Sequence, residues 1–509
     1  MSRRNALASV AVLCGLAGVV GAALLLTTGR TTTVSGNALL RGASRIDAIN
    51  SPTIVHNPVD PDNVVVSYRI DRPNYSALIQ HSRDGGKTWA PTDLPVPAGT
   101  PPCSATVDGR PCPFGPDIAF DADGKLYALY VNLEGNGNSP ANLWLATSTD
   151  GGRTLGDVIR VAGELTFQAR LAVAADKTVH ATWLQGRDTG LLSLLGVNPV
   201  VAAHLTPGGR TFSTPVVVSD SQRERVGAAS PVVDRRGNVS VIYQDYKGDR
   251  RDFENLEGPV FEDPFGLVVA RSTDGGKSFS RGVEFEAGLI PTRRFLVYLP
   301  EFPSMAAGPE GDLYAVWSDG RNGDEDVFIK RSPDGGTTWS GGVRVNDNRM
   351  QDGTNQYLPK VAVSDDGRVD VLFLDRRRDS RNVLTDAFLA SSDDAGRTFT
   401  NRLVSSESFD SGIGPSASLL HGTDFGTKLG LDSWGNRAVV AWTDTREGTE
   451  ADESQDIAAA RVTFAEEVPF LGRWPVILVL FVIGAAALAA ALVGPPSPAT
   501  PAPKEAART

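Results

Sequence analysis

A short phrase that recurs along the chain constrains its fold more than any other feature. "RSPDGGTTWS", from Arg331, returns as "HSRDGGKTWA" from His81, "RSTDGGKSFS" from Arg271 and "ASSDDAGRTFT" from Ala390. The aligned copies share one aspartate, at Asp84, Asp150, Asp274, Asp334 and Asp394, and a degenerate copy, "LTPGGRTF", has Pro207 instead. Because the copies lie 57 to 67 residues apart, a single repeat architecture is expected for this chain of 509 residues.

A second repeated phrase precedes each copy and has the pattern of a β-hairpin. Examples are "DIAFDADGKLYALYVN", "RLAVAADKTVHATWLQGRD" and "KVAVSDDGRVDVLFLDRR". Each has a short apolar run, a polar turn, and an alternating run that includes an aromatic residue. The units that begin "TIVHNPVDPDN" and "LGLDSWGNRAV" fit the same scheme and bring the count to seven. An all-β propeller of four-stranded blades is therefore predicted over residues 37–465, with seven blades favoured.

The repeated aspartate phrase itself is predicted to be structural. Asp84 is placed to accept hydrogen bonds from its own turn, Gly86 to take a positive φ, and Trp89 to pack against the sheet. A catalytic centre does not usually occur five times around a ring. The seventh unit ends before a fourth strand, and residues 37–47 precede the first unit, so we expect these two pieces to pair and close the ring.

These phrases match the Asp-box of bacterial sialidases (neuraminidases), and residues 50 to 465 resemble the sialidase-like BNR-repeat propellers. The resemblance implies that the boxes face away from the binding side, and it keeps six blades, the usual number in sialidases, as the alternative. It also implies an exo-glycosidase acting on terminal acidic sugars through three arginines, a Tyr–Glu pair and an Asp. The family's Tyr/Phe-Arg-Ile-Pro motif has no counterpart, because "AINSPTI" has Asn50 at the arginine position and "SYRIDRP" falls on the second strand. No catalytic residue is therefore assigned.

A different set of charged residues is expected on the face opposite the boxes. In several blades the second strand ends in an aromatic residue followed by Asp and Arg, as in Trp317-Ser-Asp319-Gly-Arg321. Two interpretations are open: each Asp holds its Arg in a salt bridge between blades, or several arginines bind an acidic sugar or other carboxylate. The candidate ligand-binding residues are Arg72, Arg187, Asp319, Arg321, Asp375, Arg377, Asp444 and Arg446. The long insertion from Asp245 to Gly266 is either a lid or docking surface on the same face, or a solvated loop.

Charge and cysteine content limit the partners and the compartment. The net charge of −11 argues against nucleic-acid binding. Cys103 and Cys112, in a loop rich in Pro and Gly, are predicted to form a disulfide, in agreement with an oxidising compartment. No metal-binding spacing of histidines is present, and no cofactor is predicted; a structural Ca²⁺ in an Asp-rich loop is compatible with the sequence, although no position is assigned.

The two ends of the chain predict membrane attachment. Residues 1–30 contain an uncharged run that is either an uncleaved anchor or a cleaved signal segment, and residues 474–494 are a predicted transmembrane helix followed by a disordered Pro/Ala-rich tail, 495–509. Basic residues at both extremes place the ends in the cytoplasm and the propeller on the extracytoplasmic side of the cell membrane. The predicted function is a binding or scaffolding module for glycan or cell-surface protein ligands, with the glycosidase as the alternative.

Overall fold

The computed structural model describes residues 32–41, 47–72, 74–103, 111–134, 139–186, 198–248, 264–290, 301–417 and 422–465. The chain divides into two compact units, residues 34–463 and residues 1–33 with 464–509. The predicted segments 1–30, 474–494 and 495–509 lie outside the described residues. Within the described ranges, no helix has the length and apolar character needed to cross a membrane.

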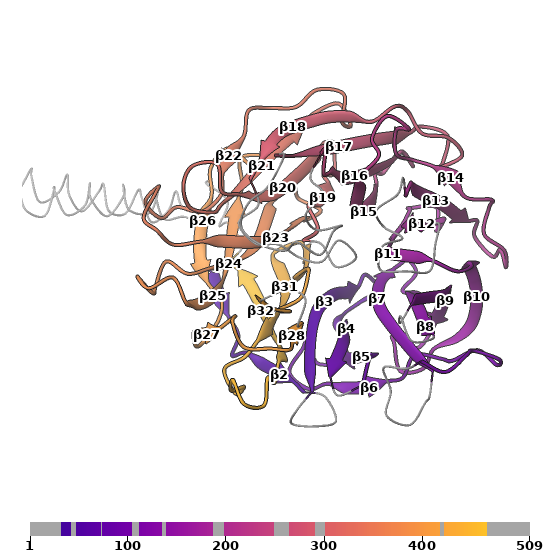
Figure 1. Ribbon diagram of the computed structural model, residues 1–509, viewed down its shortest axis with the longest axis horizontal. Coiled ribbons are helices and arrows are strands. Elements are labelled where there is room, and N and C mark those ends of the chain that lie inside the picture. Colours follow the sequence, from indigo (N-terminus) through magenta and orange to yellow (C-terminus); the bar gives the residue numbers. More distant parts are fainter. Residues whose placement is uncertain are drawn as a thin grey trace, which may run out of the picture. The chain divides into compact units, whose positions relative to one another are not determined.

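In the described part of the 34–463 unit there are seven antiparallel sheets of four or five strands and one short two-stranded sheet. Figure 1 shows the seven larger sheets following one another in sequence order. The first strand of each sheet contacts the first strand of the next, and β30 contacts both β23 and β3, so these strands surround a central channel. The predicted count of seven blades is confirmed. Blades one to six consist of β3 (Ala48–Asn57), β4 (Asp60–Arg72), β5 (Ser76–Ser82) and β6 (Ala90–Thr92); β7 (Cys112–Phe120), β8 (Leu126–Glu134), β9 (Ser139–Ser148) and β10 (Gly156–Ala162); β11 (Thr166–Val173), β12 (Val179–Gln185), β13 (Val200–Leu205) and β14 (Val216–Val217); β15 (Val226–Val233), β16 (Val239–Asp245), β17 (Phe265–Ser272) and β18 (Val283–Leu289); β19 (Ser304–Ala307), β20 (Leu313–Asp319), β21 (Asp326–Ser332) and β22 (Val343–Arg344); and β23 (Gln356–Val363), β24 (Val369–Asp375), β25 (Leu384–Ser392) and β26 (Thr400–Leu403).

The seventh blade is completed by the N-terminal part of the propeller, as predicted. It contains β30 (Gly430–Trp434), β31 (Arg437–Asp444) and β32 (Asp456–Phe464), and β2 (Ala38–Leu40) pairs antiparallel with β32 in the register Ala38 to Ala459. The strand β1 (Thr32–Val34) precedes β2, and three short strands connect blades six and seven: β27 (Phe409–Asp410), β28 (Ser416–Ala417) and β29 (Gly422–Thr423). Pairing two distant parts of the sequence closes the ring and removes a free sheet edge.

The core between the blades is built on one aromatic residue of each second strand. Six of these residues are fully buried and the seventh, Trp317, is 4% exposed. The positions are Tyr68, Tyr130, Trp183, Tyr243, Trp317, Phe373 and Trp442. Period-2 alternation places them on the face that packs against a neighbouring blade. For example, Tyr68 shares a core cluster with Val439 and Ile457 of the seventh blade. The aromatic position of the repeat is therefore the packing contact between blades.

The aspartate phrases form the turns between the third and fourth strands. In the first, the Asp84 carboxylate accepts hydrogen bonds from the Lys87 and Thr88 N–H groups and from the Thr88 hydroxyl, while the Ser82 hydroxyl donates to it at 2.8 Å. The corresponding contacts recur around Asp150, Asp274, Asp334 and Asp394. These carboxylates satisfy the backbone of their own turns. The predicted disulfide between Cys103 and Cys112 is also confirmed.

Candidate functional site: the central channel

The innermost strands share one irregularity that positions the channel-lining side chains. In blades one, two, three, four and six the pairing with the second strand shifts register in the middle of the first strand. In each of these strands one residue with a positive φ lies at the shift, and Gly426 has the equivalent place before β30. The six residues, with φ between 53° and 93°, are Ser51, Gly115, Gln168, Ala228, Leu358 and Gly426. For a residue other than glycine this conformation costs on the order of 1–3 kcal/mol. Bulges of this kind redirect side chains, often beside active sites.

The residue two positions after each irregularity faces the channel. These residues are Thr53, Asp117, Arg170, Ser230, Lys360 and Lys428, and all of them line a cavity of about 370 Å³ whose other walls include Ile54, Leu171 and Met305. Side chains from adjacent blades hold the strained segments: the Gln168 side chain accepts from the Ala228 N–H at 2.7 Å, and the Ser51 hydroxyl accepts from the Thr427 N–H at 3.0 Å. The ring thus fixes a set of polar groups around a cavity that is partly open to solvent.

Three cations surround one carboxylate in this cavity. The Lys428 ammonium donates to the Thr53 hydroxyl at 2.6 Å and lies 3.3 Å from Asp117, and the Arg170 guanidinium lies 3.6 Å from the same carboxylate. The Lys360 ammonium has no hydrogen-bond or ion-pair partner among the described residues, although it lies within electrostatic range of Asp117, Arg170 and Asp432. A second carboxylate, Asp432, also lines the cavity and is paired with His56 at 2.8 Å. With the three cations and both carboxylates ionised and His56 neutral, the net charge is 3 − 2 = +1.

The pKa values reflect this excess of positive charge. Burial and the nearby Arg170 lower the pKa of Lys428 from 10.5 to about 7, against the opposing effect of Asp117. Burial also lowers the pKa of Lys360. Burial alone would raise the pKa of Asp117, but Lys428 and Arg170 outweigh it and lower that pKa. An anion placed among the three cations would therefore be bound by groups that lack sufficient counter-charge.

A second polar cluster lies nearer to the face opposite the boxes. The Arg69 guanidinium donates to Asn50 at 2.7 Å and to Asp424 at 2.6 Å, and it lies 3.1 Å from Asp71. Burial, opposed by Arg69 and reinforced by Asp424, raises the pKa of Asp71 to about 6. Burial and Asp71 raise the pKa of the neighbouring Tyr75. Arg69 and Arg170 interact electrostatically, so the two clusters are close to each other.

The residues predicted to bind ligand lie in loops at the ends of the second strands. The Arg377 side chain donates to Asp375 at 2.7 Å, Arg446 donates to Asp444 at 2.9 Å, and Arg321 also pairs with Asp319. These three arginines have further partners, and Arg321 reaches Glu286 of the preceding blade at 2.8 Å. Arg72 pairs with Glu453, and Arg187 lies outside the described residues. Ligand binding by this set stays a prediction, and it concerns guanidinium groups that already hold carboxylates.

The channel cluster was missed at the sequence level, although a signal was present. Asp117, Arg170 and Lys360 are the first residues of "DIAF", "RLAV" and "KVAV", in which a charged residue begins an otherwise apolar inner strand. A charge on a strand that is buried on both faces requires a partner or a ligand. In the parts of the chain that the structure describes, no group of three or more His, Cys, Asp or Glu side chains is arranged to hold a metal ion.

No protein-family model matches the chain, and no curated protein is similar to it in sequence. Solved structures with a similar fold include a Dyadobacter fermentans protein of unknown function, at 14% identity and a TM-score of 0.45, covering 85% of this chain and 99% of that one. The endosialidase of phage phi92 is 12% identical with a TM-score of 0.46, covering 85% and 70%. The α-L-arabinanase of Penicillium chrysogenum, complexed with arabinobiose, is 16% identical with a TM-score of 0.44, covering 67% and 94%.

Proposed function

We propose that the propeller is a binding module for an acidic carbohydrate, whose anionic group is held in the central channel by Arg170, Lys360 and Lys428. The observation that carries this proposal is the excess of three cations over two carboxylates, Asp117 and the His56-paired Asp432, in a cavity of about 370 Å³. Cavities of a few hundred Å³ are typical of small-molecule sites. Hydroxyl groups of Thr53 and Ser304 line the same cavity and are suited to polyhydroxylated ligands.

The carboxylate of a uronic or sialic acid matches these donors. Arg170 offers a planar guanidinium, whose central carbon lies 3.9 Å from the centre of the Phe302 ring and is thereby held in place. The two lysines supply point charges from the opposite side of the channel, one from β23 and one from the segment before β30. A neutral sugar would leave this charge uncompensated.

Binding of free glucuronate and N-acetylneuraminate to the full-length protein, measured by isothermal titration calorimetry, tests the proposal. Glucose and acetate separate recognition of an acidic sugar from recognition of any sugar or any carboxylate. The variant Lys360→Met should weaken binding by about tenfold or more, because a hydrogen bond to a charged group contributes roughly 1.5–3 kcal/mol. Lys87→Met, on an exposed box turn, is the matched control. Equal affinity for glucose, or an unchanged affinity in Lys360→Met, contradicts the proposal.

Hydrolysis of a terminal acidic sugar is a second candidate function, favoured by the Asp71 carboxyl. A pKa of about 6 suits a general acid, and Arg69 and Tyr75 lie beside it. The test is turnover of a fluorogenic sialoside: an enzyme should lose activity in Asp71→Asn while still binding the free sugar acid. Absence of turnover by the unaltered protein removes this candidate and leaves the binding proposal intact.

We further infer that the chain is a divergent sialidase-like Asp-box propeller attached to the cell membrane, with the propeller on the extracytoplasmic side. The repeated box turns support the family assignment. The Cys103–Cys112 disulfide and the apolar segments within 1–30 and 474–494 support the location. Protease digestion of intact cells tests it: the propeller should be cleaved from outside, and full protection would contradict the proposed orientation.

A further inference from the structure

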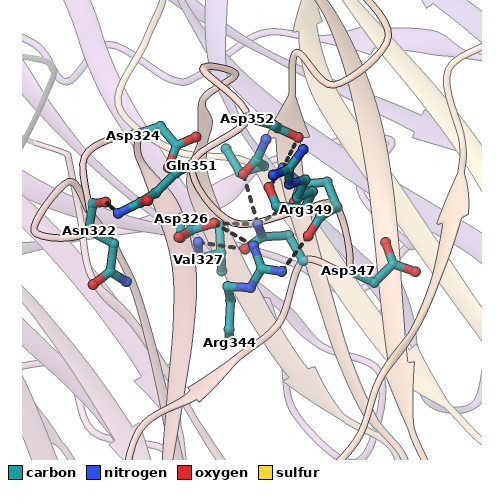
Figure 2. A network of polar contacts seen from close by, with 12 residues as sticks. Asn322, Asp324, Asp326, Val327, Arg344, Asp347, Arg349, Gln351 and Asp352 are labelled. Carbon is teal, nitrogen blue, oxygen red and sulfur yellow. Dashed lines mark hydrogen bonds and ion pairs between the residues drawn. The ribbon is translucent and has the colours of Figure 1, made fainter.

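Three consecutive buried acidic residues, Asp324, Glu325 and Asp326, lie where the β20–β21 turn leads into β21, and the hydrogen bonding of Asp324 and Asp326 is incomplete. Asp324 is 7% exposed and Asp326 is 1% exposed. One oxygen of each accepts a hydrogen bond from the segment between β22 and β23: Gly353 N–H donates to Asp324 at 2.9 Å, and the Asn346 amide donates to Asp326 at 2.7 Å. Figure 2 shows both aspartates facing this segment. The other oxygens, Asp324 Oδ1 and Asp326 Oδ2, receive no donor from any described residue.

The surroundings of Asp326 contain more acceptors than donors. The nitrogen of the Asn346 amide lies 2.7 Å from Asp326 Oδ1, 2.6 Å from Asn348 Oδ1 and 2.8 Å from Gln356 Oε1, but it has only two hydrogens. The amide is fixed in this orientation because its oxygen accepts from the Val327 N–H at 2.9 Å. Three oxygens therefore compete for two hydrogens, and the Asn346 amide has none left for the free carboxylate oxygens Asp324 Oδ1 and Asp326 Oδ2.

The next blade provides an internal comparison. Asp326 lies directly opposite Asp319 in the β20–β21 pair, and Asp386 lies directly opposite Asp375 in the β24–β25 pair, so Asp326 and Asp386 occupy the same position of the repeat. Both oxygens of Asp386 are paired, by hydroxyls of Ser405 and Ser408 and by Arg378. The deficit around Asp326 is thus not a general property of the fold.

Only one cationic side chain, Arg344, contacts the Asp326 carboxylate among the described residues, and it binds Oδ1 at 3.0 Å. The second oxygen stays unpaired in a buried position, which is costly for an ionised carboxylate. A cation ligated by oxygens resolves both the charge and the missing donors. Calcium accepts carboxylate and neutral oxygens together, in flexible geometry, whereas magnesium demands near-ideal octahedral geometry.

We propose that Asp324 Oδ1 and Asp326 Oδ2 hold a calcium ion between the β20–β21 turn and the segment that connects blades five and six. Amide oxygens of that segment, such as Asn348 Oδ1, supply neutral ligands. Two carboxylates provide less charge than the sites of cytosolic calcium sensors, so an affinity of about 0.1–1 mM is expected, as in extracellular modules. The ion would fasten the connection between two blades.

The experiment is a Ca²⁺ titration of the full-length protein after treatment with EGTA, by calorimetry and by thermal unfolding. One ion per chain should bind, and 10 mM Ca²⁺ should raise Tm by about 2–4 °C. Mg²⁺ at the same concentration should have a smaller effect. Asp326→Asn and Asp324→Asn should each abolish the response, whereas Asp386→Asn, at the matched position of blade six, should retain it.

Each result decides the proposal. If the unaltered protein binds no Ca²⁺ and shows no change in Tm, the site does not exist. If Asp326→Asn and Asp324→Asn respond as the unaltered protein does, the ion binds elsewhere and the assignment is wrong. If Asp326→Asn fails to fold, the more exposed Asp324→Asn decides. Loss of the response in both variants, with retention in Asp386→Asn, supports the site.

Discussion

Replacing Lys428 by Met should stabilise the free protein while removing anion binding. The Lys428 ammonium is buried beside Arg170 and Lys360 and shares the carboxylate of Asp117 with them. Removal of Lys428 still leaves Asp117 paired with Arg170 and with the Leu171 N–H, which donates at 3.0 Å. The substitution therefore relieves repulsion without leaving an isolated buried carboxylate.

The magnitude follows from the lowered pKa of Lys428. The unfolded chain holds this proton up to about pH 10.5, and the folded protein releases it near pH 7. Burying the charge therefore destabilises the protein fully below pH 7, and the penalty disappears as the pH rises toward 10.5. The pKa difference corresponds to about 5 kcal/mol, at about 1.36 kcal/mol for each pH unit. This difference already includes the attraction to Asp117. Loss of the contacts to Thr53 and the Pro116 carbonyl offsets part of it, at about 0.5–1.5 kcal/mol each.

At pH 6, Lys428→Met should thus be more stable than the unaltered protein by about 2–4 kcal/mol, the relieved charge burial less the two lost contacts. The advantage should shrink by about 1.4 kcal/mol for each pH unit between pH 7 and 9. Urea unfolding of both proteins, followed by tryptophan fluorescence at pH 6, 7, 8 and 9, measures this difference. A variant that is less stable at pH 6, or a difference that does not change with pH, would refute the reasoning about channel charge.

Two further predictions separate structural roles from ligand contacts. Arg377→Ala should destabilise the protein by about 3–5 kcal/mol, since it leaves the fully buried Asp375 carboxylate without its guanidinium partner; a stable variant with weakened sugar binding, seen by urea unfolding and calorimetry, would instead support the ligand role predicted for this arginine. Asp334→Asn should flatten the acid limb of the stability curve: hydrogen bonds from the Thr338 N–H and hydroxyl lower the pKa of Asp334 from 3.8 to about 2, so its contribution is present above pH 3.8 and lost as the pH falls through 2. An unchanged acid limb between pH 4 and 2 would contradict that assignment.

The fold was predictable because each element of the repeat has a local physical cause. The box turns close on their own backbone, and the aromatic residue of each second strand packs between blades, so both recur in the sequence at fixed spacing. Ring closure was predictable from the same count, since a seventh blade without a fourth strand and a surplus strand at residues 37–47 require each other. Seven blades could be counted because six of the seven units keep a recognisable box or its degenerate form.

The channel cluster was not predictable from these patterns, because it depends on a break in strand periodicity. A residue with positive φ shifts the alternation by one step, so Arg170 and Lys360 face the channel although a regular strand would direct them differently. Neither Gln168 nor Leu358 carries the glycine signature by which such a backbone is normally recognised. The sequence pattern instead favoured the Asp-x-Arg loops, whose charges recur visibly in the sequence but are paired in the fold.

Charge accounting separates the parts of the molecule that hold themselves together from those suited to ligands. At the ends of the second strands, Asp375 and Asp444 each have an arginine two residues later, and no charge is left over within these pairs. The channel has the opposite arrangement, with Lys360 unpaired among three cations, and the β20–β21 turn has unpaired carboxylate oxygens. Since isolated buried charges are expensive, two imbalances of opposite sign in one ring argue for two ligands of opposite charge.

Binding the anion should relieve the repulsion between Lys428 and its neighbouring cations and raise the pKa of Lys428. Sugar-acid affinity should therefore be highest below pH 7 and fall at higher pH, as Lys428 loses its proton.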